Sequence, residues 1–372
     1  MAEKDLKQMY RTRTEGNFPD TIELLGRAYT KVEDLRYGTN PHQPAAFYRP
    51  TAGKNLVLGA YELLKTGKSG LSQTNIEDMH HAVGILKYLR RPACAVMKHC
   101  NPSGAAIQVQ EMPLVEVYQR ARDADAQAAF GSVVAFNTAV DADTAAEIMQ
   151  TVVEGVAAPA FTPEALETFQ DFDRFKRNKE IRIVKLPDFS GLPKFIEDGT
   201  EVFEMKVFDD GSVVLATPYL SRVKGPQDLV PAYCDHAKKG RIEIARKPTT
   251  RELDDLLFAW YVNIHVRSNG CVIARNGQTL AVGTGEQDRV GAVEQAVIKA
   301  ANKYTGAETM DGAVMSSDGF FPFRDAVDAA TKKGVSAIVQ PGGSVNDYDA
   351  ILACNEANAA MVFSMERCFS HH

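Results

Sequence analysis

Helical and strand-like spacings of apolar residues alternate along most of this sequence. Apolar residues recur every three or four positions from Ile76 to Leu89, which predicts a helix over 75–91. The next apolar run, 93–97, is short and continuous, as is typical of a buried strand. The same reasoning predicts helices over 112–127, 144–153 and 162–169, and strands over 128–137, 156–161 and 181–187.

The alternation continues in the second half of the chain. A hairpin is expected around Asp209-Asp210-Gly211, and a second one at Asn276-Gly277, a dipeptide favoured in two-residue turns. Between them, Thr249 or Thr250 precedes a helix over 249–265, with Glu252 close to the capping-box position. Further helices are predicted over 290–300, 323–333 and 348–358, and strands over 314–317, 336–341 and 359–364.

The chain is therefore predicted to be an α/β protein with two units of similar size. A cluster of Pro and Gly in 187–200 favours a boundary there, dividing the chain into 1–195 and 196–372. Residues 1–30 suggest a polar leader with a short helix, and 34–50 is expected to be largely loop. No internal repeat can be aligned by eye.

Composition narrows the function classes. The 372 residues carry 42 Lys and Arg against 48 Asp and Glu, a net charge of −6, which argues against a protein that binds nucleic acid mainly through phosphates. The sequence has no apolar run near 18 residues and no apolar signal segment, so we expect a cytoplasmic protein. Six cysteines without a C-x-x-C pair predict free thiols, and neither a disulfide framework nor a metal site.

Lys98 and His99 stand side by side where the buried strand 93–97 ends. Active sites of α/β proteins are usually built at such strand exits. Successive strand side chains point to opposite faces, so the two residues can share a site only if the backbone leaves strand geometry. Pro102 and Gly104 make that departure plausible, while the alternative is a surface loop that holds two basic residues.

Nine sequence blocks together resemble one family, the aminoimidazole carboxamide ribotide (AICAR) transformylases, which form one domain of a bifunctional purine-synthesis protein. The blocks occur in family order and are RYGTNPHQ (36–43), LSQTNIED (71–78), MKHCNPSGAA (97–106), AFGSVVAFN (129–137), RKPT (246–249), HVRSNGCVIARNGQTLAVGTGEQDR (265–289), SSDGFFPFRDAVD (316–328), QPGGSVND (340–347) and RCFSHH (367–372).

The resemblance implies formyl transfer from 10-formyltetrahydrofolate to the 5-amino group of AICAR. It also implies two cytidine-deaminase-like subdomains, each a sheet between helices in three layers, without the H-x-E and P-C-x-x-C zinc signature of the deaminases. A homodimer with its active site at the interface is expected, and a monovalent cation such as K+ is an option. Only 35 residues precede Arg36, so we expect a stand-alone transformylase that works with a separate IMP cyclohydrolase.

The chemistry and the resemblance together assign the catalytic roles. The attacking amine must lose a proton and the leaving folate nitrogen must gain one, and a histidine can serve both transfers. We therefore expect His99 to move protons, and Lys98 and Asn269 to stabilise developing charge. The alternatives are a core histidine for His99 and a turn residue before Gly270 for Asn269.

The remaining site residues are implied by the resemblance alone, and their alternatives are solvated charges and an aromatic core cluster. At least one of the three phenylalanines in 320–323 is expected to be structural. The AICAR-binding group comprises Arg36, Tyr37, Gly131, Glu154, Phe320 and Arg367, and the folate-binding group comprises Arg289, Phe321, Pro322, Phe323 and Asp325. Two rival functions remain open: a catalytically silent nucleotide-binding regulator, and formylation of AICAR from a donor other than folate.

Overall fold

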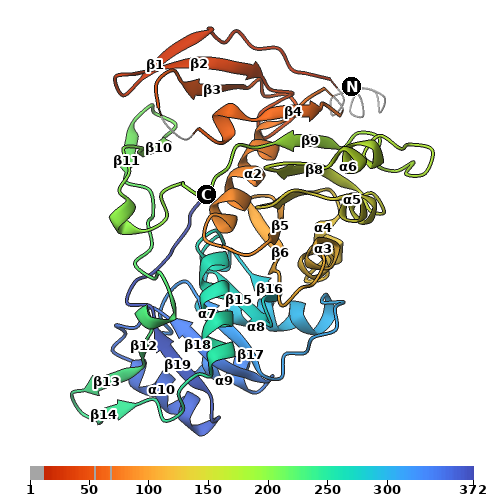
Figure 1. Ribbon diagram of the computed structural model, residues 1–372. Coiled ribbons are helices and arrows are strands. Elements are labelled where there is room, and N and C mark those ends of the chain that lie inside the picture. The colour runs from red at the N-terminus through yellow and green to blue at the C-terminus, as the bar shows by residue number, and fades with distance from the viewer. Residues whose placement is uncertain (1–11, 54–55, 68) are drawn as a thin grey trace, which may run out of the picture.

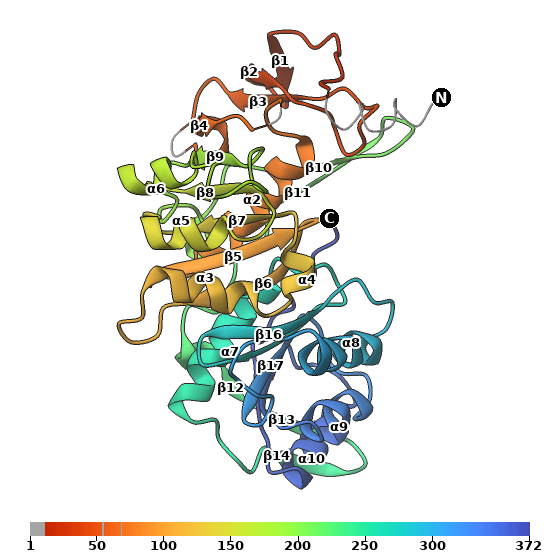
Figure 2. The same ribbon diagram turned by 90° about the vertical axis from the view of Figure 1, so that its right-hand side faces the viewer.

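The centre of the molecule is a 12-stranded mixed sheet that runs through both halves of the chain (Figures 1 and 2). The computed structural model describes residues 12–53, 56–67 and 69–372. From one edge to the other the strands are β12 (Val230–Pro231), β19 (Ala360–Phe363), β18 (Val335–Gln340), β17 (Ala313–Ser317), β15 (Cys271–Arg275), β16 (Gln278–Gly283), β6 (Asn101–Ile107), β5 (Ala93–Lys98), β7 (Ser132–Phe136), β8 (Val153–Ala158), β9 (Arg182–Lys185) and β4 (Glu62–Lys65).

The sheet contains the same topology twice. Outward from its middle, the first half has the order β6-β5-β7-β8-β9-β4 and the second β16-β15-β17-β18-β19-β12. In each half two antiparallel pairings are followed by two parallel ones and a final antiparallel one. An internal structural repeat is therefore present, although the sequence shows none by eye.

Helices cover both faces of the sheet, and the strands alternate between them. Ala95 and Met97 of β5 face a core that includes α2 (Gln73–Leu86) and α7 (Thr250–Asn263), whereas Cys94 and Val96 face the opposite core. On that opposite face lie α3 (Leu114–Arg122), α5 (Ala142–Ile148), α6 (Pro163–Thr168), α8 (Arg289–Asn302), α9 (Asp325–Thr331) and α10 (Asp347–Glu356). The predicted α/β fold in three layers is confirmed.

The two halves share one hydrophobic core on the α2 and α7 face. Ile85 of α2 and Trp260 of α7 belong to the same buried cluster, and β16 pairs with β6 through Gln278 and Ala106. Gly84 lets α2 approach the end of α7, because a Cβ there would lie 2.2 Å from the His265 ring. The sheet and this core are continuous across the two halves. The division of the chain into 1–195 and 196–372 therefore remains a proposal.

The expectation of a polar leader with a short helix over 1–30 is wrong for the described residues 12–30, and its first eleven residues lie outside the described chain. Residues 12–30 include β1 (Thr21–Leu24) and the start of β2 (Arg27–Asp34). Strand β2 pairs with β1 and with β3 (Ala46–Pro50) in an antiparallel sheet. Because many of their side chains are exposed and polar, hydrophobic spacing does not reveal them. The largely-loop prediction for 34–50 is wrong at β3.

The remaining elements agree with expectation in most places. The hairpin of β10 (Glu204–Val207) and β11 (Val213–Ala216) and the Thr249–Glu252 capping box of α7 are confirmed. The strand expected over 128–137 begins later, because Asp125 caps the short helix α4 (Ala126–Ala129). Sequence reasoning missed β4, β6, β12, β13 (Tyr233–His236), β14 (Gly240–Glu243), η1 (Leu58–Ala60), η2 (Ile196–Asp198) and η3 (Pro226–Asp228).

Candidate functional site

Lys98 and His99 lie at a tight turn between two antiparallel strands. Lys98 pairs with Asn101, which leaves His99 and Cys100 as the two turn residues, with φ of 56° and 62°. The backbone thus leaves strand geometry directly after Lys98, as a shared site requires. The strand β6 that follows was not predicted, because Pro102 and Gly104 suggest a loop.

The Asp78 carboxylate of α2 holds this turn in place. Its Oδ1 accepts a hydrogen bond from the Cys100 amide at 2.7 Å. Burial raises the pKa of Asp78 from 3.8 to about 7, and the nearby carboxylates of Glu154 and Glu77 add to the rise. No motif reasoning had singled out Asp78, although it ends one of the matching blocks.

Lys98 reaches the loop that carries Gly131. The Lys98 ammonium donates to the Phe130 carbonyl at 2.6 Å. Gly131 has a φ of +73°, and a Cβ there would lie 3.9 Å from Lys98 Nζ. The structure therefore brings Gly131 beside Lys98, and the positive φ at this position favours glycine.

Arg36, Tyr37 and Glu154 gather near a second arginine, Arg182. Arg36 is 5% exposed, donates to the Tyr37 hydroxyl at 2.9 Å and leaves its Nε without a hydrogen-bond partner. Glu154 accepts from Asn75 Nδ2 at 3.0 Å and lies 4.0 Å from Arg182. Burial, followed by repulsion from Arg36, lowers the pKa of Arg182 to about 10. Two guanidinium groups beside one carboxylate make this a candidate anion site.

The segment that carries Asn269 lies against the turn within the same chain. Asn101 Oδ1 accepts hydrogen bonds from the Arg267 amide at 2.9 Å and the Thr284 hydroxyl at 2.7 Å. Asn269 Nδ2 donates to the Glu286 carbonyl at 2.8 Å, which fixes the orientation of its amide. Asn269 is therefore two residues from a direct contact with the Lys98–His99 hairpin.

A cavity of about 260 Å³ opens beside this junction. Lys299 of α8 lines it, donates to the Val282 carbonyl at 2.9 Å, and has its pKa lowered chiefly by burial. Sequence reasoning missed Lys299 because it carries no motif. The cavity is lined by Lys98, His99, Asn101, Pro102, Ser103, Asp125, Ala128, Val282, Thr284 and Lys299.

Arg289 and Arg367 meet at the ring of Phe369. Their guanidinium carbons lie 5.8 Å and 4.8 Å from the centre of that ring. Arg289 also forms a buried ion pair with Asp318, whose other oxygen accepts the Gly270 amide at 2.8 Å. The two arginines expected on different ligands are thus neighbours, next to the residue that follows Asn269.

The predicted aromatic cluster separates into core and surface. Phe320 and Phe323 are 46% and 63% exposed, whereas Phe321 is 0% exposed and packs in the core of the second half. The side chain of Phe321 is thus buried in the core, and the assignment of this residue to the folate site remains a proposal. Pro322 is half-buried, and Asp325 is exposed at the start of α9.

In 12–53, 56–67 and 69–372, no group of three His, Cys, Asp or Glu is placed to hold a metal ion. Within the same residues, none of the helices combines the length and the apolar character needed to cross a membrane.

Comparison with known proteins gives a consistent family. The family described as "AICARFT/IMPCHase bienzyme" matches residues 3–299. Three curated relatives named "Bifunctional purine biosynthesis protein PurH" are similar over nearly the whole chain. The relative from Oceanobacillus iheyensis is 36% identical over 360 residues, 97% of this chain. Those from Acetivibrio thermocellus and Magnetococcus marinus are each 38% identical over 96% of it.

The chain spans only part of these relatives, 63% of the first and 62% of the other two. The family match nevertheless covers most of the chain, and it includes the Lys98–His99 turn, the Arg36 cluster and Asn269. This protein therefore belongs to the AICARFT/IMPCHase bienzyme family.

Proposed function

We propose that this chain transfers a formyl group from 10-formyltetrahydrofolate to the 5-amino group of AICAR, a step of purine (IMP) biosynthesis. The observation that carries the proposal is the junction at which Asn101 of the Lys98–His99 hairpin accepts the Arg267 amide. This junction brings the proposed proton-transfer group His99, the cation Lys98 and the segment that carries Asn269 together. The names of the relatives support a role in purine biosynthesis.

The nucleotide is proposed to bind between the Arg36 cluster and the Lys98 turn. Arg36 and the nearby Arg182, which the sequence did not predict, supply positive charge for the phosphate, and Tyr37 packs against Arg36. Glu154 is proposed to accept hydrogen bonds from the ribose hydroxyls. Gly131, Phe320 and Arg367 complete the AICAR site.

The reaction proceeds by addition and elimination at the formyl carbon. His99 takes the proton from the AICAR amine as the new C–N bond forms, and the carbonyl oxygen becomes an oxyanion. Lys98 and Asn269 stabilise this charge, since a cation and an amide donor near an oxyanion favour its formation. His99 then returns the proton to the folate nitrogen as the old C–N bond breaks.

The folate is proposed to lie on the Arg289 and Phe323 side of the site. Phe323 exposes its ring, and Pro322 flanks it. The exposed Asp325 carboxylate, whose Oδ1 accepts the Ala326 amide at 2.9 Å, is proposed to accept hydrogen bonds from the pterin edge. Phe321 supports this surface from the core. A monovalent cation such as K+ is proposed as well.

We further propose a cytoplasmic homodimer whose active site lies at the interface. Phe130, Phe320 and Phe369 are exposed apolar side chains close to the candidate site residues. A second subunit that covered them would also exclude water from the reaction. Analytical ultracentrifugation of the chain tests this assembly.

The experiment that tests the function is a donor-swap assay. Formation of formyl-AICAR is followed with 10-formyltetrahydrofolate, and in parallel with formate plus ATP as the source of formyl phosphate. Turnover with the folate alone supports the proposal, and turnover with the other donor alone overturns it. AICAR binding without turnover from either donor supports the silent-regulator alternative.

The catalytic assignment needs a separate variant. His99→Ala is expected to abolish formyl transfer while AICAR binding is largely retained. Near-normal turnover of His99→Ala would show that another group moves the proton.

A further inference from the structure

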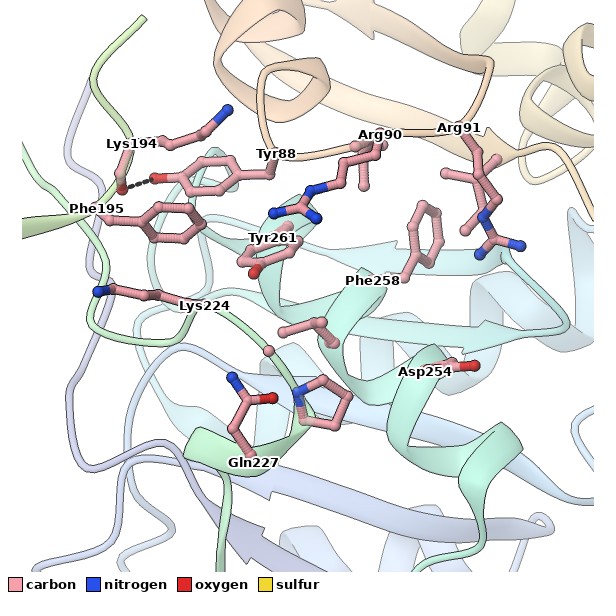
Figure 3. A pocket seen from close by; sticks show the side chains of 15 residues that line it. Tyr88, Arg90, Arg91, Lys194, Phe195, Lys224, Gln227, Asp254, Phe258 and Tyr261 are labelled. Atoms are coloured by element: carbon pink, nitrogen blue, oxygen red, sulfur yellow. Dashed lines mark hydrogen bonds between the residues drawn. The ribbon is translucent and has the colours of Figure 1, made fainter. Parts of the chain in front are cut away.

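A larger cavity, of about 560 Å³, opens at the opposite end of β5 from the Lys98 turn (Figure 3). Its walls come from the segment before β5, from 194–195, from 224–227 and from α7. Because β5 has six residues, the two ends are about 17 Å apart. The cavity is therefore separate from the candidate active site. Its lining residues with polar or aromatic side chains are Tyr88, Arg90, Arg91, Lys194, Phe195, Lys224, Gln227, Asp254, Phe258 and Tyr261.

The cavity has an excess of positive charge. Arg90 and Arg91 are exposed, and among the described residues neither guanidinium has a hydrogen bond or an ion pair. The Lys194 ammonium donates to the Ser190 carbonyl at 2.9 Å and to the Lys87 carbonyl at 3.2 Å. Asp198 accepts the Lys194 backbone amide at 2.9 Å, but among the described residues the ammonium forms no ion pair. Asp254 is the acidic side chain among those that line the cavity.

The excess of positive charge also affects Lys87, which precedes the lining residue Tyr88 in the chain. Its ammonium donates to the Pro193 carbonyl at 2.7 Å. Burial and then repulsion from Lys194 lower the pKa of Lys87 to about 8. Lys224 differs from these residues because it pairs with Glu197 at 2.8 Å. An anion placed here would relieve the repulsion among the remaining cations.

The apolar wall of the cavity is held rigidly. The rings of Tyr88 and Tyr261 stack with centres 4.6 Å apart, and Phe195 meets Tyr88 edge to face at 5.7 Å. Both tyrosine hydroxyls are occupied, donating to the Lys194 carbonyl at 2.9 Å and the Val223 carbonyl at 3.0 Å. Figure 3 shows the Arg90 guanidinium extending toward the rings of Tyr88 and Tyr261.

We propose that this cavity binds a small organic anion built on a flat aromatic ring, of the size and chemistry of a nucleoside monophosphate. Arg90 and Arg91 bind the phosphate, because guanidinium groups match phosphate oxygens through paired N–H donors. The ring packs on the apolar wall beside Phe195 and Leu257. The volume falls in the range of small-molecule sites, and the proposal does not depend on formyl transfer.

Such a ligand would contact both halves of the chain. The segment at Tyr88–Arg91 belongs to the first half, whereas Phe258 and Tyr261 belong to α7 of the second. Binding would therefore stabilise the packing of the halves and raise the melting temperature, since a ligand that binds only the folded chain stabilises it.

The test uses the full chain carrying Arg36→Ala, which removes the proposed substrate site. Isothermal titration calorimetry compares AMP, adenosine and ribose 5-phosphate. AMP is expected to bind at least about tenfold more tightly than either fragment, because only AMP engages both the arginines and the wall. Adding Arg90→Gln or Arg91→Gln is expected to weaken AMP about tenfold each. Arg177→Gln, at an exposed arginine outside the cavity, is the matched control and should change nothing.

Several outcomes overturn the proposal. AMP affinity unchanged by Arg90→Gln and Arg91→Gln would place the ligand elsewhere. Ribose 5-phosphate binding as tightly as AMP would show that the aromatic wall is not used. Loss of all AMP binding with Arg36→Ala alone would mean that the candidate active site is the one nucleotide site. Circular dichroism of each variant separates these results from loss of folding.

Discussion

The Asp78 carboxylate accepts the Cys100 amide at 2.7 Å, and Asp255 accepts the Gly277 amide at 2.8 Å. The two contacts are the same contact in the two copies of the repeat, each joining the helix on the shared face to the central hairpin. In one copy the turn is Asn276-Gly277, a favoured pair for positive φ. In the other copy the turn is His99-Cys100, and residues of these two types rarely adopt a positive φ.

Replacing His99-Cys100 with Asn-Gly should therefore stabilise the fold while it removes formyl transfer. The double variant is expected to gain about 1 kcal/mol in free energy of unfolding, because both new residues tolerate positive φ better. Urea denaturation and the formyl-transfer assay measure the two effects. A loss of stability would mean that the His99 and Cys100 side chains contribute more than their backbone strain costs.

Asp78→Asn should change how stability depends on pH. Asp78 has a pKa near 3.8 when unfolded and about 7 when folded, so between these values the folded chain binds a proton that the unfolded chain lacks. The contribution of Asp78 protonation to the free energy of unfolding is fully present below about pH 4. It falls as the pH rises to about 7, and no further change follows above that pH. Asparagine does not titrate but can still accept the Cys100 amide. The melting temperature of Asp78→Asn relative to the parent should therefore rise from pH 4 to 7 and then level off. A difference that does not change with pH would show that Asp78 is ionised throughout.

Gly84→Ala should destabilise the protein although alanine favours helices. A Cβ at this position would lie 2.2 Å from the His265 ring, so α2 and the end of α7 must move apart. We expect a loss of about 1–3 kcal/mol in thermal or urea unfolding. Gly191→Ala is the matched control, because nothing lies within 4 Å of its Cβ position. Equal effects of the two substitutions would contradict the close approach.

Arg36→Lys should weaken AICAR binding more than it slows the chemistry. Lysine keeps the charge but loses the paired donors and the stacking on Tyr37. We expect KM for AICAR to rise about tenfold or more, with kcat changed less, in steady-state kinetics. Arg49→Lys, at an exposed arginine of β3, is the control. A fall in kcat at unchanged KM would place Arg36 at the reacting atoms instead.

The sequence predicted most helices and buried strands because their apolar spacing is regular, as in α2 and β5. It failed where that signal is weak. Strand β1 is largely exposed, β2 is polar and only partly buried, and β6 begins with Asn-Pro, which suggests a loop.

For the site, the matching blocks pointed to Arg36, Lys98, His99 and Asn269. The roles of these residues remain predictions, although the structure places Lys98 and His99 at one turn. Arg182 and Lys299 could not be foreseen, because they reach the site from β9 and α8 without any local motif. Phe321 shows the opposite limit, since a motif cannot tell which member of an aromatic run faces the core.

The pairing of β16 with β6 has a consequence for the chain as a whole. Each half on its own would leave that strand as an unprotected sheet edge, and exposed edges invite aggregation with other chains. In the intact chain each half shields the other. The pairing of β16 with β6 thus protects the chain against edge-to-edge aggregation. A fragment that contains one half alone would expose β6 or β16 as an edge strand.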